Sequence, residues 1–198
     1  MRNIIFAALL PIVVGCRTTS DSVPVNELGT LSVFGQSWKI LGGQWEPAPD
    51  GVVGSGGWLM TREEFGDTTI EIDIEHVSGM GGRTTGVGFR YQPWTVPEQA
   101  SGYGVNITTG GTTYNVFKGV QGAWNPVNPA FTTFQPSPAL QPRKNHFEIR
   151  SVGAAQAIKV NGQPLAEFND SAYAKGAINL WVESTVDRVK FSNFRVTR

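Results

Sequence analysis

The sequence predicts an all-β domain built as a two-sheet antiparallel sandwich, and three observations support this fold class. First, short runs of alternating or mostly apolar residues follow one another from about residue 38 onward, separated by turn residues. Second, the 198 residues include 24 Gly and 12 Pro, which punctuate such strands. Third, no stretch favours an amphipathic helix longer than about two turns. Because roughly ten to twelve short strands do not easily form one flat sheet, we expect two packed sheets.

The expected strands follow from the alternation and the turn residues. A first pair is expected at residues 38–45 and 51–60, with Asp50-Gly51 in the turn between them. Asn161-Gly162 predicts a type I′ hairpin, since both central residues of that turn need a positive φ. The proline-rich residues 121–143 are expected to form one long loop, and such loops are often functional. The remaining strands are expected at residues 69–77, 86–91, 102–108, 112–118, 146–152, 156–160, 163–168, 177–183 and 188–196.

The charge balance narrows the class of partner. The chain has 16 basic and 16 acidic residues and a formal net charge of zero, so it offers no basic stripe for nucleic acid. It also contains 6 Trp. Neutral surfaces that expose Trp suit sugars, whose apolar ring faces stack on aromatic rings. The composition therefore favours carbohydrate as the partner and argues against nucleic acid.

The first residues have the pattern of an export signal. A short basic start is followed by an apolar run at residues 4–14, which spans roughly 16 Å as a helix and is too short to cross a ~30 Å membrane core. Val13-Val14-Gly15-Cys16 resembles the bacterial lipobox, and Cys16 is the only cysteine. The resemblance implies that Cys16 carries the lipid. The alternative is an ordinary signal peptide with a chance cysteine.

This pattern divides the chain into three parts. We expect a signal peptide at residues 1–15, a lipidated tether at 16–36 and the sandwich domain at 37–198. The domain would then work in the cell envelope, attached to the membrane through its lipid anchor. Arg17 is not the Asp that resembles an inner-membrane retention signal, so the outer membrane is expected if the host is Gram-negative.

A series of motifs in the domain resembles the 3-keto-disaccharide hydrolase family. The matching motifs occur in the family's order: Trp58-Leu59-Met60-Thr61, Phe65-Gly66-Asp67, Thr85-Gly86-Val87-Gly88-Phe89-Arg90, Gly102-Tyr103-Gly104-Val105-Asn106-Ile107, Ile158-Lys159-Val160-Asn161-Gly162 and Val189-Lys190-Phe191-Ser192-Asn193-Phe194-Arg195-Val196. The resemblance implies a concanavalin A-like jelly roll, of the type found in lectins and glucanases. It also implies an activity on 3-keto-glycosides.

The same resemblance implies a set of site residues, and this chain departs from the family at several of the positions concerned. Carried over position by position, it leaves Asp73, Arg90 and Tyr103 as catalytic candidates on one ligand face. Gly104 stands where the family has an acidic residue. Other departures are Thr84 for Asn, Asn106 for Gln and Trp181 for Gln. Further ligand-binding candidates are Glu71, Glu75, Trp94, Asn106, Trp124 and Trp181, with Trp94 and Trp124 expected as stacking platforms in loops.

A second motif suggests a different hydrolase. Glu71-Ile72-Asp73-Ile74-Glu75 matches the catalytic pattern of laminarinase- and lichenase-type enzymes, which share the jelly-roll architecture. Alternate strand residues lie ~6.6 Å apart on one face, so the three carboxylates could line one groove for retaining hydrolysis. The plainer interpretation is a half-buried strand with a solvated acidic face. No metal or cofactor is expected, because neither His76 nor His146 has a Cys or a spaced acidic partner.

Two functions from different classes therefore stay open. One is a carbohydrate-active enzyme that processes a modified glycoside. The other is a non-catalytic, lectin-like module that binds glycan or a protein partner in the envelope. Because this fold occurs in both classes of protein, only the arrangement of the site residues can distinguish the two functions. A closed pocket around Asp73, Arg90 and Tyr103 would favour catalysis, and an open groove lined by Trp would favour binding.

Overall fold

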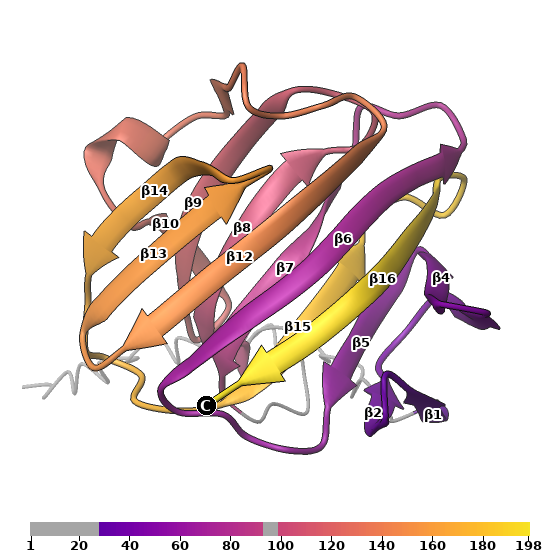
Figure 1. Cartoon of the computed structure of the whole chain (residues 1–198), viewed down its shortest axis with the longest axis horizontal. Helices are drawn as coiled ribbons and strands as arrows, with labels where there is room; N and C mark the ends of the chain where they lie inside the picture. Colours follow the sequence, from indigo (N-terminus) through magenta and orange to yellow (C-terminus); the bar gives the residue numbers. More distant parts are fainter. Residues whose placement is uncertain (1–27, 93–98) are drawn as a thin grey trace, which may run out of the picture.

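The chain folds into two antiparallel sheets packed face to face as a jelly-roll sandwich, as predicted (Figure 1). The computed structural model describes residues 28–92 and 99–198. Sheet A consists, in order, of β1 (Gly29–Val33), β2 (Gln36–Ile40), β5 (Gly57–Thr61), β15 (Ala177–Val182), β7 (Thr84–Tyr91), β8 (Gly102–Thr108), β9 (Thr113–Val120) and β10 (Ala123–Pro126), and β11 (Gln135–Pro136) also pairs with β9. Sheet B consists, in order, of β14 (Gln163–Asn169), β13 (Ala155–Val160), β12 (Lys144–Val152), β6 (Thr68–Ser78), β16 (Arg188–Thr197), β4 (Gly51–Ser55) and β3 (Gln44–Ala48).

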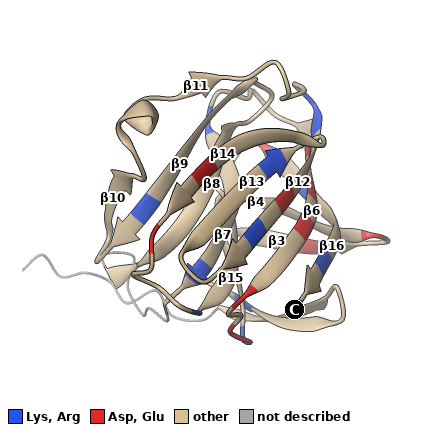
Figure 2. Ribbon diagram, turned by 60° about the vertical axis from the view of Figure 1, so that its left-hand side comes forward, with Lys and Arg blue, Asp and Glu red and all other residues tan. Residues whose placement is uncertain are grey.

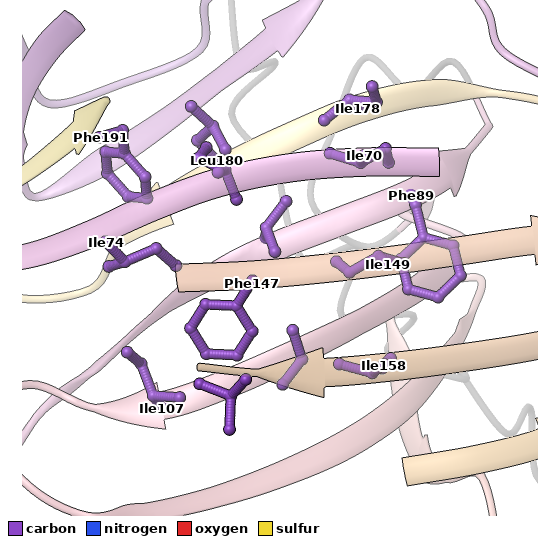
Figure 3. Close-up of a cluster of buried hydrophobic side chains, with 14 of the residues drawn as sticks. Ile70, Ile74, Phe89, Ile107, Phe147, Ile149, Ile158, Ile178, Leu180 and Phe191 are labelled. Atoms are coloured by element: carbon purple, nitrogen blue, oxygen red, sulfur yellow. The ribbon is translucent and has the colours of Figure 1, made fainter. Parts of the chain in front are cut away.

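The core lies between the sheets and follows the alternation of the strands. Ile70, Ile72 and Ile74 of β6 are at most 2% exposed, as the pattern of this strand predicts. Figure 3 shows Ile70 and Ile74 in the layer between the sheets, near Leu180 of β15 in sheet A. Burying each such side chain contributes about 1.5–3 kcal/mol, so the interior alone explains why one face of each strand is apolar. The outer face of each sheet is therefore available for a functional site.

The two strands expected at residues 38–45 and 51–60 are wrong as single strands. Each range holds two strands that belong to different sheets: β2 then β3, and β4 then β5. The chain changes sheet at Gly42-Gly43, where φ is 130° and 74°, and at Gly56, where φ is 64°. These left-handed conformations favour glycine, and they end each strand although the apolar pattern continues.

Two other boundaries differ from expectation. The range expected as tether up to residue 36 contains β1, which pairs with β2, so the sandwich includes the chain from Gly29 onward. Residues 121–143 are not one loop, because β10, β11 and the 3-10 helix η2 (Pro129–Phe131) lie within them. β10 and β11 pair with the two ends of β9, so this segment covers an edge that would otherwise expose unpaired backbone groups.

The predicted Asn-Gly hairpin is confirmed. Asn161 and Gly162 have φ values of 51° and 78°, and they join β13 to β14. Within residues 28–92 and 99–198, no helix is long and apolar enough to span a membrane.

Candidate functional site

A groove of about 490 Å³ crosses the outer face of sheet A. Six neighbouring strands, β5, β15, β7, β8, β9 and β10, line it. They contribute, in that order, Trp58, Trp181, Thr84, Asn106, Phe117 and Trp124. The volume lies within the range of small-molecule sites, which is about 300–1,000 Å³. Because the groove is on the solvent side of the sheet, the residues that build it alternate with those that build the core.

The strand register arranges these side chains in rows across the sheet. Trp58, Trp181, Gly86, Asn106 and Asn115 are successive cross-strand partners on β5, β15, β7, β8 and β9. Side chains directly opposite each other on one face lie ~4.5–5.5 Å apart. Gly86 has no side chain, and the ring of Trp181 covers its place in the row. One end of this row is aromatic and the other end is amide.

Glycines on the same face give the aromatic rings room to lie over the sheet. A Cβ atom on Gly86 would stand 2.5 Å from Cζ2 of Trp181, and one on Gly104 would stand 2.5 Å from Cζ of Phe117. A Cβ atom on Gly119 would meet Trp124 at the same distance. Distances this short are steric clashes, so each ring occupies the space that a side chain would fill. We call Gly86, Gly104 and Gly119 the glycine floor.

The glycine floor explains the departure at position 104. Where the family has an acidic residue, Gly104 admits the ring of Phe117 instead. That ring packs edge-on against Trp124, with centroids 5.0 Å apart, and against Trp181 at 5.8 Å. Such aromatic pairs contribute about 0.5–1.5 kcal/mol beyond the area they bury. Position 104 therefore contributes to an aromatic surface and not to a charged one.

Polar groups occupy the other part of the groove. Asn106 Nδ2 donates to Asn115 Oδ1 at 2.9 Å, which leaves further amide hydrogens and the Asn106 carbonyl oxygen for a ligand. Glu183 Oε2 accepts hydrogen bonds from the backbone N–H and the hydroxyl of Thr84, at 3.1 and 2.8 Å. Arg83 is 3.9 Å from the other oxygen of Glu183. Among the described residues that line the groove, Glu183 is the only carboxylate.

A β-bulge in β7 decides which side chain reaches the groove. Gly88 pairs with Asn179 and Tyr91 pairs with Ala177, so Phe89 and Arg90 face one residue, Ile178. Strict alternation would place Arg90 on the outer face beside Gly86 and Gly88. The bulge, in which Arg90 has a φ of 52°, instead turns Arg90 inward and places Tyr91 in the groove.

Arg90 acts as a clamp at one end of the sandwich. Its guanidinium, 2% exposed, donates to the backbone oxygens of Gly153 at 2.7 Å and Tyr173 at 3.0 Å. It also contacts Asp67 at 3.1 Å. These contacts join β7 of sheet A to loops around sheet B. The expectation that Arg90 lies on the outer face with the ligand candidates is wrong, because the bulge turns it into the interior. The alternation of the sequence does not reveal this bulge.

Tyr103 is also an interior residue. It is fully buried, and its hydroxyl donates to Asp170 Oδ1 at 2.7 Å. Burial, together with this hydrogen bond, raises the pKa of Tyr103 well above its usual range. Burial raises the pKa of Asp170, but hydrogen bonds from Lys118 and Tyr103 outweigh it and hold that pKa below its ordinary value. The phenol of Tyr103 therefore stays protonated and holds a loop in place.

The acidic strand lies on the opposite surface of the molecule, the outer face of sheet B. Asp73 Oδ1 is 2.7 Å from Nδ1 of His146, and its Oδ2 is 2.8 Å from Nζ of Lys144. Asn193 Nδ2 also donates to Asp73 at 2.7 Å. Burial raises the pKa of Asp73, but these three hydrogen bonds outweigh it and keep the pKa below its ordinary value. Asp73 is thus a paired structural carboxylate.

Its two neighbours on β6 are paired as well. Glu71 faces Arg195 at 3.8 Å and Glu75 faces Arg143 at 3.5 Å. Figure 2 shows acidic and basic segments interspersed across β12, β6 and β16. The acidic alternation therefore forms a charge-paired surface of sheet B, and it does not line the groove on sheet A.

The structure brings together only part of the expected site. Asn106, Trp124 and Trp181 meet in the groove. The catalytic set does not form one cluster: Asp73 is on the outer face of sheet B, while Arg90 and Tyr103 lie at the interior end of the sandwich. Glu71 and Glu75 accompany Asp73. Trp94 and Cys16 lie outside the described residues.

Sequence reasoning missed several groove residues, namely Trp58, Tyr91, Asn115, Phe117 and Glu183. One signal could have found them. Gly86 and Gly88 in one expected strand, and Gly102 and Gly104 in the next, place four glycines at outward positions of two neighbouring strands. Glycine in a strand interior weakens the strand unless something packs closely against it, so this pattern predicts rings or a ligand on that face.

Comparisons with known proteins agree with the fold. The carbohydrate-binding module CBM66 from Bacillus subtilis superposes with a TM-score of 0.65 at 20% identity, covering 81% of this chain and 95% of that one. A Bacillus subtilis protein of unknown function with a galectin-like fold gives 0.51 at 15% identity, covering 80% and 88%. The β-glucanase of Bacillus licheniformis gives 0.50 at 11% identity, covering 83% and 79%. A search of curated protein sequences finds no match.

Fold and family together define a carbohydrate-active jelly-roll protein. The family model described as the 3-keto-alpha-glucoside-1,2-lyase-like domain matches residues 32–197. The chain belongs to this family, which confirms the resemblance seen in its motifs.

Proposed function

We propose that the protein binds glycans in the groove on sheet A, where sugar rings stack on Trp181, Phe117 and Trp124. The observation that carries the proposal is the glycine floor. It allows aromatic rings to form a concave surface, and the Asn106–Asn115 amide pair lies beside that surface. Aromatic surfaces with a few well-placed polar groups are typical of small-ligand sites. The likeness to a carbohydrate-binding module supports the same function.

The ionisable groups of the groove favour binding over two-carboxylate hydrolysis. Retaining and inverting glycosidases need a pair of carboxyl groups about 5–5.5 or 6.5–9.5 Å apart. Glu183 has no carboxylate partner among the described lining residues. Burial raises the pKa of Tyr91 far above its usual range, so its phenol stays neutral. The acidic set of the laminarinase alternative, Glu71, Asp73 and Glu75, lies on the other sheet and is ion-paired.

A second candidate function is the processing of 3-keto-glycosides, which the family match favours. A keto group at C3 acidifies the proton at C2, so one general base can remove that proton without a second carboxylate. The bond from C1 to the glycosidic oxygen then breaks, a C1–C2 double bond forms, and the leaving alcohol takes a proton from the protonated base or from water. In this candidate the base is Glu183, whose carboxylate is held by Thr84 at the rim of the groove.

One paired assay separates the two candidates. The purified domain is titrated with neutral oligosaccharides by calorimetry and, separately, incubated with 3-keto-glucosides while free sugar and unsaturated product are measured. For binding alone, we expect an affinity for a neutral hexasaccharide that Trp124→Ala and Trp181→Ala each lower about tenfold or more, with no product formed. Val152→Ala, an exposed apolar position on sheet B, serves as the matched control.

The opposite outcome is equally specific. Product formation that disappears in Glu183→Gln, while glycan affinity survives, would replace binding by catalysis as the function of the groove. Absence of both affinity and product would reject both candidates.

We further propose that the protein is attached to the membrane of the cell envelope through lipid on Cys16, with the outer membrane as the site in a Gram-negative host. The lipobox-like Val13-Val14-Gly15-Cys16 supports this proposal. Stable attachment needs two or more acyl chains, which a diacylated and processed cysteine supplies. Labelled fatty acid fed to expressing cells should enter the full-length protein but not Cys16→Ala. Equal labelling of both would overturn the proposal.

A further inference from the structure

We propose that the groove holds a linear, neutral oligosaccharide that lies across the strands of sheet A, with Trp58 and Trp124 at its two ends. This inference rests on the proposed glycan binding and specifies its ligand. A pocket for a single terminal sugar gathers its exposed aromatic rings around one point. A groove for a sugar chain spaces them along its length.

The exposed rings stand at opposite ends of the groove. Trp58 on β5 is 36% exposed and Trp124 on β10 is 52% exposed, whereas Trp181 between them is 7% exposed. β5 and β10 are separated by five strand-to-strand steps, through β15, β7, β8 and β9. At ~4.8 Å a step, the two strands lie roughly 24 Å apart. The Trp124 ring lies over Gly119 of β9, so the two rings are closer than the strands, at about four steps or roughly 19 Å. A single sugar ring cannot reach both, but a chain of several units can.

The middle of the groove is continuous between these ends. Every strand from β5 to β10 contributes at least one residue to the lining of the groove. Trp181 and Phe117 lie over Gly86 and Gly104, so the central surface is apolar and follows the sheet. Asn106 and Asn115 continue the cross-strand row that begins at Trp58 and Trp181. Their remaining amide groups can form hydrogen bonds with hydroxyls of the central sugar units. The chain would thus have an apolar contact and a polar contact at each central unit.

The charges of the groove point to a neutral ligand. No Lys or Arg is among the described lining residues, and Glu183 is the only carboxylate. Glu183 keeps one oxygen on Thr84, while Arg83 stands 3.9 Å from the other. A sugar acid would meet this carboxylate with no cation on the groove surface to compensate, and like charges disfavour binding.

The test is calorimetric titration of the purified domain with glucose and with its β-1,3-, β-1,4- and α-1,4-linked oligosaccharides up to the hexasaccharide. We expect the affinity for at least one linkage series to rise with length. Trp58→Ala and Trp124→Ala should each weaken the hexasaccharide about tenfold and leave the disaccharide within about twofold. Trp181→Ala should weaken every length, and Val152→Ala none. Circular dichroism of each variant verifies folding.

The outcomes distinguish this inference from the function beneath it. A disaccharide that binds as tightly as the hexasaccharide, with Trp58→Ala silent at all lengths, would overturn the chain-binding inference and leave glycan binding intact. A uronic-acid tetrasaccharide that binds more tightly than its neutral counterpart would overturn the neutral specificity. If no carbohydrate in the series binds, the proposed function itself is wrong.

Discussion

The outer faces of the two sheets are built from the same alternating pattern but are opposite kinds of surface. On sheet B the outward residues of β6 are Glu71, Asp73 and Glu75, and basic side chains of neighbouring strands neutralise them. On sheet A the outward positions of β7 and β8 include Gly86 and Gly104, and aromatic rings from adjacent strands cover them. One face is filled by ion pairs and the other is hollowed by missing side chains.

The difference shows why a chemically suggestive motif can be the wrong place for a site. Three carboxylates on one strand resemble a catalytic set, yet their charges are satisfied within the protein. The solvent-exposed pairs of Glu71 and Glu75 contribute little, and the paired Asp73 is buried, so none of the three carboxylates is left for a ligand to compensate. Glycines carry no functional group, but by admitting rings they create concave apolar surface.

Arg90→Lys should produce the largest loss of stability. Lysine keeps the charge but has no planar fork to hold the backbone oxygens of Gly153 and Tyr173 together with Asp67. We expect the free energy of unfolding to fall by about 2–4 kcal/mol, since buried acceptors lose their donor. Urea denaturation measures this loss. Arg195→Lys, on the exposed face of sheet B, is the matched control, and an equal loss there would refute the clamp.

Gly104→Ala should affect both stability and ligand binding. Its Cβ would stand 2.5 Å from the ring of Phe117, so the ring must leave the glycine floor. Overpacking of this kind costs about 1–3 kcal/mol, and we expect glycan affinity to fall about tenfold. Gly66→Ala is the control, because its nearest neighbour would be 3.8 Å away. If Phe117 is displaced and glycan affinity does not change, the glycine floor is not required for ligand binding.

Asp73→Asn should weaken the fold moderately and leave the groove intact. The carboxylate accepts from Lys144, His146 and Asn193, so at neutral pH we expect a loss of about 1–2 kcal/mol. Its pKa is lower in the folded state than its ordinary value of 3.8. The stability it contributes is therefore present above pH 3.8 and is lost as the pH falls through the folded pKa.

Chemical denaturation at several pH values checks this behaviour. The difference between the native protein and Asp73→Asn should shrink as the pH falls below about 4, where the unfolded state binds the proton first. It should level off once the pH is below the folded-state pKa, where both states bind the proton. A difference that persists at low pH would mean that packing, not charge, explains the loss. A change in glycan affinity would contradict the separation of the two faces.

Glu71→Gln should have the smallest effect. The carboxylate is 3.8 Å from Arg195, whose side chain is 75% exposed, so solvent screens the pair. We expect a change of less than about 0.5 kcal/mol, with glycan affinity unchanged. Thermal unfolding at low and at moderate salt measures it. A loss larger than that of Asp73→Asn would show that the exposed pairs of sheet B act as one network.

The sequence predicted the sandwich, most strands and the family because these depend on local alternation and on motifs in order. Ile70, Ile72 and Ile74 are core residues for that reason. It also predicted Trp124, Trp181 and Asn106, which now lie in one groove.

The rest of the site depends on how distant strands pair. Nothing local indicates that Trp58 and Trp181 become direct partners across β5 and β15. The position of Arg90 depends on a bulge that a period of two cannot reveal. The crossings from one sheet to the other at Gly42-Gly43 and at Gly56 could not be predicted either, because the apolar pattern continues through them.

The bulge in β7 also affects how this chain should be compared with its relatives. Arg90 is the extra residue opposite Ile178, and without it Phe89 and Tyr91 would keep their present sides of the sheet. We expect a one-residue deletion at this position to preserve the groove while removing the clamp at the end of the sandwich. In a relative that has an arginine here but regular pairing, the same alignment column would present its charge to the ligand. The placement of a single gap therefore determines whether this arginine is assigned to the interior or to the binding surface.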